Sequence, residues 1–519
     1  MIQGFWATSW KRLAVVLAGV LYALGAVGCS HTCADTFTCY SFDLGSDCPE
    51  EPAEAPGGEV PAECGVWASA SLGDDANDGS PDAPVATLAQ AAAKALHGRR
   101  RVYACAETFN EVVTWPAGVA LHGGFDCTGL DWRYVGNDTR TLVTAPAGDI
   151  PLTLSGSIHQ EASLLTDLKV EAATATQPGG SSIAVLARAD ARAEIRRSKL
   201  ETGHGADGAD GDDGDHFGNP AKGGLHGKNG AAACTAGTGL GGELVALDCE
   251  EDASFGGHGG NGGEMAATPG DDGEVAPASN PQGFGLGGGA EDLVTGLLCT
   301  PGFGGANGKD GDPGLGGFWP PSLNESGYLG VWGGGGKRGR AGQGGGGGGA
   351  SAASAAACGA PRLGGAGGGS GGTGGCGGRG GRGGQPGGAS IGLATLTSAI
   401  LLVDVQITTG DGGRGGAGGV PQQGGWGGLP GIGGAGMPSG PNPGCGGGIG
   451  GYGGDGGPAG GGLGGPALAV AYVGAKGPDD LNTTFGHGSA GIGGPGSDPD
   501  LASARGEDGI AAEQQALLP

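Results

Sequence analysis

Two groups of aspartates carry the oxygen ligands that calcium prefers. Asp74, Asp75 and Asp78 fall in one short turn, and a second acidic loop holds Asp207, Asp210, Asp212, Asp213 and Asp215. Neither group has the Asp-x-Asp-x-Asp-Gly spacing, with a glutamate at position twelve, that forms a helix–loop–helix calcium site. A solvated acidic loop is therefore the favoured interpretation. Calcium, with Asp74, Asp75, Asp78, Asp210 and Asp213 as its candidate ligands, is the one cofactor that the sequence leaves open.

Three Gly-His-Gly triplets are centred on His204, His258 and His487. Each resembles the triplet that lies beside catalytic aspartates in pectin-degrading β-helix hydrolases. With nine histidines among so many glycines, roughly two such triplets are expected by chance. The companion rung of paired aspartates is missing, as are the Walker A and HExxH motifs. The sequence therefore nominates no catalytic residue and no bound organic cofactor.

The chain is strongly acidic, with 26 Lys and Arg against 53 Asp and Glu and a net charge of −27. Such a surface repels DNA, RNA and anionic lipid, so no nucleic-acid partner is expected. It suits cations, solubility and an extracytoplasmic location. The alternative is a solvated acidic coat that serves no partner.

Residues 1–28 have the pattern of an export signal. Lys11 and Arg12 precede an apolar run, residues 13–28, that is short for a membrane span and typical of a signal peptide. The run ends at Ala26-Val27-Gly28-Cys29, which resembles the lipobox of bacterial lipoproteins. That resemblance implies cleavage before Cys29, lipidation of Cys29 and a membrane partner, and Ser30 favours the outer membrane. The alternative is an ordinary signal peptide with Cys29 in a disulfide.

Twelve cysteines remain after Cys29, an even number that suits disulfides in an oxidising compartment. Four of them cluster in a segment rich in Pro and Glu, which predicts a disulfide-tied stalk over residues 29–64 with three alternative pairings: Cys33, Cys39, Cys48 and Cys64. Their spacing does not match a zinc ribbon or finger.

The pattern of short strands and turns in residues 65–205 predicts a small β-rich domain. A strand at Val66–Ser69 and a turn are followed by a helix that starts at Thr87, whose spacing to Gln90 fits a capping box. Short strands follow, at 102–105, 111–115, 119–122, 152–154 and 168–171. This entry resembles that of right-handed parallel β-helices of the pectin-lyase-like class, in which the helix caps the open end of the core. The alternative is a β-sandwich, which the lack of tight hairpin dipeptides disfavours.

Spacing within this domain also predicts one cross-link and one inward face. Cys105 and Cys127 are 22 residues apart, about one coil, which would place them on neighbouring rungs within reach of a disulfide. Alternation puts Leu168 and Val170 inward. The same reasoning places Leu401, Val403, Val405 and Ile407 inward in a later strand region.

An internal repeat continues the pattern. Three segments, beginning at Gly179, Gly387 and Gly464, share a Gly-Gly entry, two strands and an exit into glycine-rich sequence. We interpret them as further coils of one β-helix, with long excursions leaving the same corner. The expected organisation is a β-helix over 65–205, glycine-rich insertions at 206–386 and 411–463, coils at 387–410 and 464–488, and a tail at 489–519.

The chain holds 130 glycines among 519 residues, and the excursions repeat with a period of three. One run carries a side chain after every Gly-Gly pair: Ser370, Thr373, Cys376, Arg379, Arg382 and Gln385. In a three-residue helix these side chains share one edge, and the two bare edges let neighbouring segments exchange backbone hydrogen bonds. That pattern resembles polyglycine II bundles, pinned by the remaining cysteines. The alternative is a disordered linker. Two apolar stretches, 244–247 and 293–298, are expected to be packed anchors.

Taken whole, the chain resembles a family of glycine-rich surface lipoproteins of Gram-negative soil bacteria. The resemblance rests on the lipobox, the block Val102–Cys127 and the Gly-Gly-x-Ser-Ile coil entries. It implies a location at the outer membrane or cell surface and an all-β architecture, not an activity. The expected function is structural, adhesive or matrix-forming, without catalysis, with an extracellular polysaccharide or cell-surface partner. The alternative function is a secreted carbohydrate-active β-helix enzyme, either lyase or hydrolase; an ice- or surface-binding role ranks third.

Overall fold

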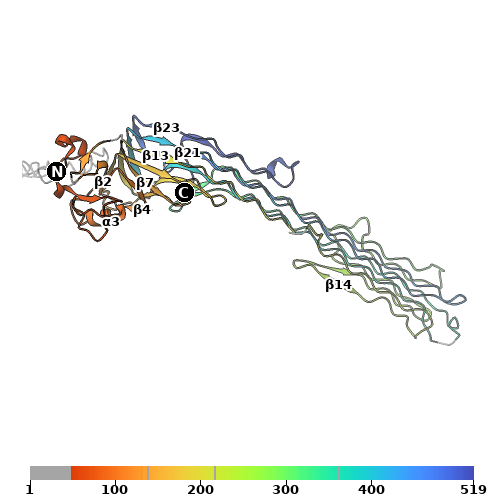
Figure 1. Ribbon diagram of the computed structural model, residues 1–519. Coiled ribbons are helices and arrows are strands. Elements are labelled where there is room, and N and C mark those ends of the chain that lie inside the picture. Colours follow the sequence, from red (N-terminus) through yellow and green to blue (C-terminus); the bar gives the residue numbers. More distant parts are fainter. Residues whose placement is uncertain (1–47, 130, 137–138, 216–217, 360–361) are drawn as a thin grey trace, which may run out of the picture.

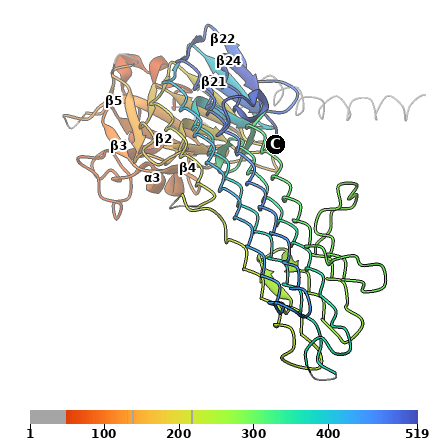
Figure 2. The ribbon, with the colours of Figure 1, turned by 90° about the vertical axis from the view of Figure 1, so that its right-hand side faces the viewer.

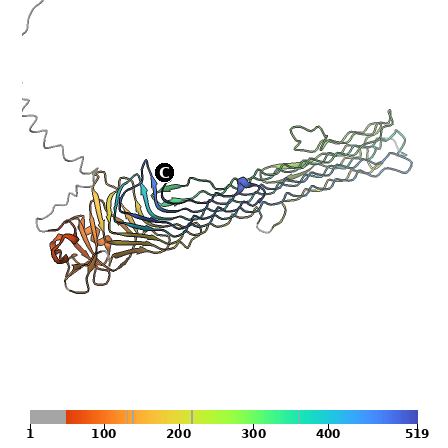
Figure 3. The same cartoon turned by 90° about the horizontal axis from the view of Figure 1, so that it is seen from above.

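The computed structural model of the protein describes residues 48–519 apart from 130, 137–138, 216–217 and 360–361. A head of β-strands carries a long rod of extended glycine-rich segments that leave the head and return to it (Figure 1, Figure 3). The C-terminus lies at the head. The expected leader, the lipidated Cys29, Cys33 and Cys39 lie outside the described residues.

The head consists of three parallel sheets that the chain visits in turn, so the expected all-β class is confirmed. The first sheet contains β1 (Val66–Ala68), β2 (Arg101–Cys105), β5 (Ala120–Asp126), β9 (Ala162–Thr166), β12 (Arg192–Arg196), β19 (Ala399–Val403) and β22 (Asp479–Leu481), with β6 (Arg133–Tyr134) antiparallel to β5. The second contains β3 (Thr108–Asn110), β7 (Thr141–Ala145), β10 (Leu168–Ala172), β13 (Lys199–Thr202), β20 (Gln406–Thr408) and β23 (Thr484–Gly486). The third contains β4 (Val113–Trp115), β8 (Leu152–Leu154), β11 (Ser182–Ala187), β18 (Ser390–Leu396), β21 (Ala467–Val473) and β24 (Ala511–Ala516).

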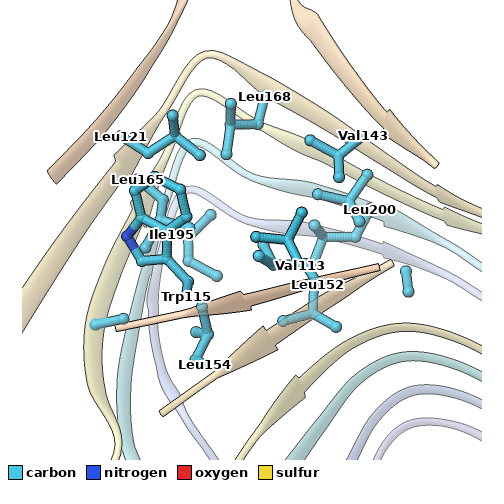
Figure 4. Packing of buried hydrophobic residues seen from close by; sticks show 14 of the residues in the cluster. Val113, Trp115, Leu121, Val143, Leu152, Leu154, Leu165, Leu168, Ile195 and Leu200 are labelled. Atoms are coloured by element: carbon cyan, nitrogen blue, oxygen red, sulfur yellow. The ribbon is translucent and has the colours of Figure 1, made fainter. Parts of the chain in front are cut away.

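One apolar core fills the space between the three sheets (Figure 4). In the second sheet, strand register stacks four buried side chains in one column: Val143, Val170, Leu200 and Ile407. Leu168 and Val170 point inward, as the alternation predicted. The prediction for β19 was wrong, because Ile400 and Leu402 are buried in place of Leu401 and Val403. A left-handed residue between the strands, Asp404 with φ of 53°, resets the alternation before Val405.

The expected capping helix is α3 (Leu88–Ala95), and its N-cap is Thr87, whose side chain accepts a hydrogen bond from the Gln90 N–H. The apolar side of α3 joins the same core as the first strands, so the helix closes that end of the core. The side chain of Glu111 adds a second cap, because it accepts hydrogen bonds from the N–H groups of Leu88 and Ala89.

The described part of the expected stalk, residues 48–64, lies against the head. A disulfide joins Cys48 to Cys64, and the segment contains the short 3₁₀ turns η1 (Pro52–Glu54), η2 (Pro56–Gly58) and η3 (Ala62–Cys64). Cys64 packs in an apolar cluster with Trp67 and Tyr103. Burial of these groups holds the segment over the first sheet, where a disulfide-tied stalk was expected.

The three repeats found in the sequence pair directly in the third sheet. Ser182 lies opposite Ser390, which lies opposite Ala467, so the Gly-Gly entries stack in register. The tail contributes one more strand, β24, that sequence reasoning missed. A hairpin of β16 (Ser322–Asn324) and β17 (Gly327–Leu329) returns from the rod, and its Leu323 and Tyr328 cover the outer side of the third sheet.

The rod is built from extended threads that are neither helix nor strand (Figure 2). Its main threads run over residues 203–215 with 218–233, and over 256–264, 300–318, 330–353, 364–388, 409–436, 443–466 and 486–497. Backbone hydrogen bonds join neighbouring threads at every third residue, as from Gly413, Gly416 and Gly419 to the thread over 364–388. The described rod also holds one hairpin, β14 (Val245–Asp248) with β15 (Ala253–Gly256), and one 3₁₀ turn, η4 (Ala502–Ala504).

Three disulfides link threads that are far apart in sequence: Cys234–Cys358, Cys249–Cys376 and Cys299–Cys445. Of the two expected anchors, 244–247 becomes β14 and buries Leu247. The other, 293–298, is not packed. Val294 is 94% exposed, because its loop turns on the Asp292 side chain beyond the reach of any core.

Candidate functional site

Acidic side chains from successive coils converge on the outer face of the second sheet. Strand register places Lys169 beside Lys199 and Glu171 beside Glu201 on β10 and β13. The Lys169 Nζ lies 2.7 Å from one carboxylate, that of Glu171, and 2.9 Å from the other, that of Glu201. These hydrogen bonds raise the pKa of Lys169, so its ammonium stays charged and cannot act as a base. The cluster is a neutralised ion-pair network.

A second polar network lies buried between the first sheet and residues 48–64. Arg197 donates to both carboxylate oxygens of the buried Asp167, each at 3.0 Å, and pairs with Glu51 of the covering segment at 2.8 Å. Burial, with the nearby arginine charges, lowers the pKa of His122 to about 3. The His122 Nδ1 lies 3.1 Å from the Thr166 hydroxyl, and its ring stacks on Tyr103. His122 is fully buried, so it has no access to a substrate.

The Gly-His-Gly triplets lie on three different threads of the rod. The Nδ1 atom of His204 accepts the Asp411 N–H at 2.9 Å, which makes that imidazole a cap for a neighbouring thread. His258 lies further along the rod, where its carbonyl accepts the Asp271 N–H. His487 faces its own neighbour, Gly488. The triplets therefore do not form one site.

The acidic loop is a ladder of backbone caps. Asp207, Asp210 and Asp213 each accept one N–H from the adjacent thread, at 2.7 Å, and the donors are Arg414, Ala417 and Val420. Asn229 and Asn307 do the same for other thread pairs. The spacing of three follows from the thread geometry, since every third N–H of an outer thread points away from the bundle.

The calcium candidates are therefore occupied by the fold. The carboxylates of Asp210 and Asp213 serve the ladder, and those of Asp74, Asp75 and Asp78 accept N–H groups in the turns before α3. Within residues 48–519, the described parts of the chain bring no three His, Cys, Asp or Glu side chains together as a metal site. Sequence composition pointed to calcium because capping and chelation use the same carboxylate oxygens.

Two serine motifs were missed in the reading of the sequence, which counted none. The first, Gly368-Gly369-Ser370-Gly371-Gly372, lies in the glycine-rich thread over 364–388, where Ser370 is buried. The second is Gly388-Ala389-Ser390-Ile391-Gly392, and both have the G-x-S-x-G spacing of hydrolase nucleophiles. That motif needs a sharp turn between a strand and a helix, whereas Ser390 lies fully buried in β18. Its hydroxyl is engaged by Thr202 and by the Gly203 carbonyl. The match comes from the glycine content.

The disulfide expected between adjacent rungs is present, with Cys105 of β2 joined to Cys127 just after β5. The two strands pair in parallel, which brings the two Cα atoms to 5.8 Å. This cross-link lies beside the aromatic cluster under residues 48–64 and ties the first two coils together.

The central thread, residues 364–388, explains how side chains are sorted in the rod. It bonds to threads on five sides, and its distal half is buried with only small side chains, Ser370, Thr373 and Cys376, at every third place. Where the covering threads end, the same register carries Arg379 and Arg382, which are exposed. At every third residue of this thread, the side chain is small where neighbouring threads surround it and large where they do not.

An uncharged apolar surface covers the distal part of the rod. Residues 415–454 contain no Asp, Glu, Lys or Arg, although the chain as a whole is strongly acidic. Six large apolar side chains on threads 409–436 and 443–466 are exposed, one of them Val420. We call the other five the distal face: Trp426, Leu429, Ile432, Ile449 and Tyr452. The rings of Trp426 and Tyr452 lie 6.2 Å apart. Contiguous exposed apolar patches are uncommon on the surfaces of monomeric proteins.

No family model matches this chain, and no curated protein is similar to it. Within the described residues, no helix is both long and apolar enough to cross a membrane. The five disulfides among the described residues indicate an oxidising, extracytoplasmic compartment.

Proposed function

We propose that this protein is an exported, lipid-anchored surface protein with a structural or adhesive role and no catalytic activity. The observation that carries the proposal is the rod: an acidic, disulfide-pinned bundle that ends in the uncharged distal face. At about 3.1 Å per residue, a thread such as 364–388 spans roughly 80 Å. Such a length can hold a binding surface away from the cell envelope.

The head is, in this proposal, a right-handed parallel β-helix of the pectin-lyase-like kind. The three-sheet order supports it, and so does one column of left-handed bends between the first and second sheets. These bends fall at Asp167, Arg197, Asp404 and Asn482, with φ between 44° and 59°. A single residue in this conformation turns the chain sharply between strands, and Asp and Asn tolerate it better than most residues.

The rod is, in the same proposal, a polyglycine II bundle. The three-residue hydrogen-bond period supports this proposal. So does the close approach of glycine Cα atoms to carbonyl oxygens of neighbouring threads. A Cβ built on Gly371 would lie 1.8 Å from the Gly345 carbonyl oxygen, and most threads have the same restriction. Only glycine lets backbones approach this closely, which is the property of polyglycine packing.

The anchor in this proposal is a lipid on Cys29, with the outer membrane or cell surface as the location. The lipobox-like sequence Ala26-Val27-Gly28-Cys29 and the even number of remaining cysteines support it. Mass spectrometry of the mature protein should find an acylated N-terminal Cys29, and the protein should partition into detergent. The Cys29→Ser variant should lose both properties. A mature chain that retains residues 1–28 would contradict the anchor.

A carbohydrate-active enzyme is the second candidate function. The observation in its favour is the pair Glu171 and Glu201 on successive coils, bridged by Lys169. Against it stands the ion pairing of Lys169, together with the covers that residues 48–64 and the β16–β17 hairpin place over the first and third sheets. An enzyme of this fold needs an acid and a base held free in one groove.

A further inference from the structure

The rod has one surface strip that the chain itself fills only in part. We call it the lane: the strip between the outgoing thread 409–436 and the returning thread 443–466. Near the head, residues 486–497 lie in the lane. The N–H groups of Gly412, Gly415 and Gly418 bond to this segment, and its own N–H groups bond to the carbonyls of Gly465, Gly462 and Ala459. The lane is therefore a site whose occupant is visible: an extended chain rich in glycine.

Beyond Ser497 the same hydrogen-bonding register continues without an occupant. The N–H groups of Gly427 and Gly433 extend the donor series, and the carbonyls of Gly450 and Gly447 extend the acceptor series. None of these four groups bonds to another described residue. Gly427, Gly433 and Gly447 are partly exposed, Gly450 is buried, and Pro430 between the two donors has no N–H. Unpaired backbone groups in one register are a template for another chain, as at the edge of a β-sheet.

The stretch between Ser497 and Gly427 is closed by the chain's own residues. Pro421 has no N–H, and the Gly424 N–H is capped by the side chain of Asp455 at 2.8 Å. Next along the two threads, the rings of Trp426 and Tyr452 lie 6.2 Å apart. These groups separate the filled part of the lane from the open part, so the open part is a site of its own.

The open part of the lane is flanked by the rest of the distal face. Leu429 and Ile432 come from one thread, with Ile432 71% exposed, and Ile449 comes from the other. In other proteins, polyproline II segments bind in grooves lined by aromatic side chains. The absence of charge over 415–454 means that an uncharged segment approaches without electrostatic cost.

We infer that the open part of the lane, between Gly427–Gly433 and Gly447–Gly450, binds an extended polyproline II segment rich in glycine and proline from another polypeptide. The ligand would run in the direction of residues 486–497, parallel to thread 409–436. Its glycines would face the rod, since a Cβ on Gly491 or Gly494 would lie 1.8–1.9 Å from a carbonyl oxygen of that thread. Its side chains would contact Trp426, Leu429 and Ile432.

The test uses the secreted full-length Cys29→Ser protein and a fluorescein-labelled peptide with the sequence of residues 486–497. Anisotropy should rise to saturation, and a peptide with Ala in place of Gly491 and Gly494 should bind at least about tenfold more weakly. The Leu429→Asp/Ile432→Asp variant should weaken binding by a similar factor. Leu240→Asp, an exposed apolar position on another thread, is the matched control and should not change it. Circular dichroism checks that each variant is folded.

Three outcomes would overturn the inference: no binding at millimolar protein, equal binding of the alanine peptide, or binding that is indifferent to Leu429→Asp/Ile432→Asp. Sedimentation equilibrium adds a fourth. If the protein forms a dimer that the double variant abolishes, the occupant is a second copy. The inference goes beyond the proposed anchored role, and the two proposals are tested separately. The lipid anchor is tested by mass spectrometry at Cys29, whereas peptide binding to the lane is measured on the Cys29→Ser protein, which has no anchor.

Discussion

At the residue scale, most of the chemistry in this protein is the satisfaction of backbone groups. Asp207, Asp210 and Asp213 use their carboxylates on N–H groups of a neighbouring thread. Pro421 and Pro430 occupy two of the positions whose backbone nitrogens face the lane. Because proline has no N–H, no donor is left unsatisfied at these positions. The acidic side chains and the prolines at these positions are therefore partly a consequence of exposing one edge of each outer thread.

Glycine in the central thread should be irreplaceable. A Cβ at Gly371 would lie 1.8 Å from the Gly345 oxygen, so Gly371→Ala should lower the free energy of unfolding of the rod by about 1–3 kcal/mol or more. At Gly335 the nearest atom would be 3.4 Å away, so Gly335→Ala should be neutral or slightly stabilising. Hydrogen exchange of the rod amides measures both. Equal effects at the two positions would contradict close thread packing.

His122 should make stability depend on pH. Its folded pKa of about 3 lies below the unfolded value of about 6.5, so the folded state disfavours its protonation. The stabilising contribution is complete above pH 6.5 and is lost as the pH falls toward 3. Between pH 7.5 and 5.0 this residue should cost about 2 kcal/mol of unfolding free energy. In urea titrations His122→Gln should remove most of that pH dependence; an unchanged slope would assign it to other groups.

At the element scale, each end and face of the head core is covered by a different part of the chain. Helix α3 closes the N-terminal end, residues 48–64 cover the first sheet, and the β16–β17 hairpin covers the third. Coverage of this kind hides apolar and polar surface that a coil alone would expose to water. It also removes two of the three outer faces from use as a substrate groove.

The helix cap should be measurable on its own. Thr87→Ala removes the acceptor for the Gln90 N–H and should destabilise the head by about 1 kcal/mol. Thr87→Ser keeps the hydroxyl and should stay within a few tenths of a kcal/mol of the original. Chemical denaturation followed by far-ultraviolet circular dichroism compares the three proteins. Thr87→Ala as stable as Thr87→Ser would mean that packing of the helix, and not its cap, holds this end.

At the scale of the whole molecule, the head organises the rod. Each excursion leaves the head after a strand of the second sheet (β13, β20 or β23) and re-enters it at a strand of the third sheet (β18, β21 or β24), so the threads start and end at fixed positions. Backbone hydrogen bonds and three disulfides then hold threads that are more than a hundred residues apart in sequence. The result is an elongated particle, with the rod extending away from the head (Figure 1).

The protein should show no turnover of pectin, polygalacturonate or alginate, with or without calcium. Lys169 is held in ion pairs by Glu171 and Glu201, and Asp210 and Asp213 are used by the rod. Product release from each polymer, measured by reducing ends and by absorbance of unsaturated products, tests this. Turnover that disappears in Glu201→Gln would favour the enzymatic alternative; glycan binding without turnover would agree with an adhesive role.

The sequence by itself determined the features that depend on local periodicity. Several strand positions, the Thr87 cap, the repeat entries and the period of three in the glycine-rich segments could be read from residue spacing, because each follows from backbone geometry over a few residues. The pairing of Cys105 with Cys127 could be predicted for the same reason, since one coil has a nearly constant length.

Only the tertiary structure decided which segments become neighbours. The sequence around Asp210 does not show that Ala417 lies beside it in the folded protein. Its carboxylate was therefore a candidate calcium ligand, whereas in the structure it accepts the Ala417 N–H. The covering position of residues 48–64, the reset of alternation at Asp404 and the open part of the lane have the same origin. Each depends on contacts between residues far apart in sequence, and such contacts are set by how whole coils and threads pack, not by the order of residues within any one of them.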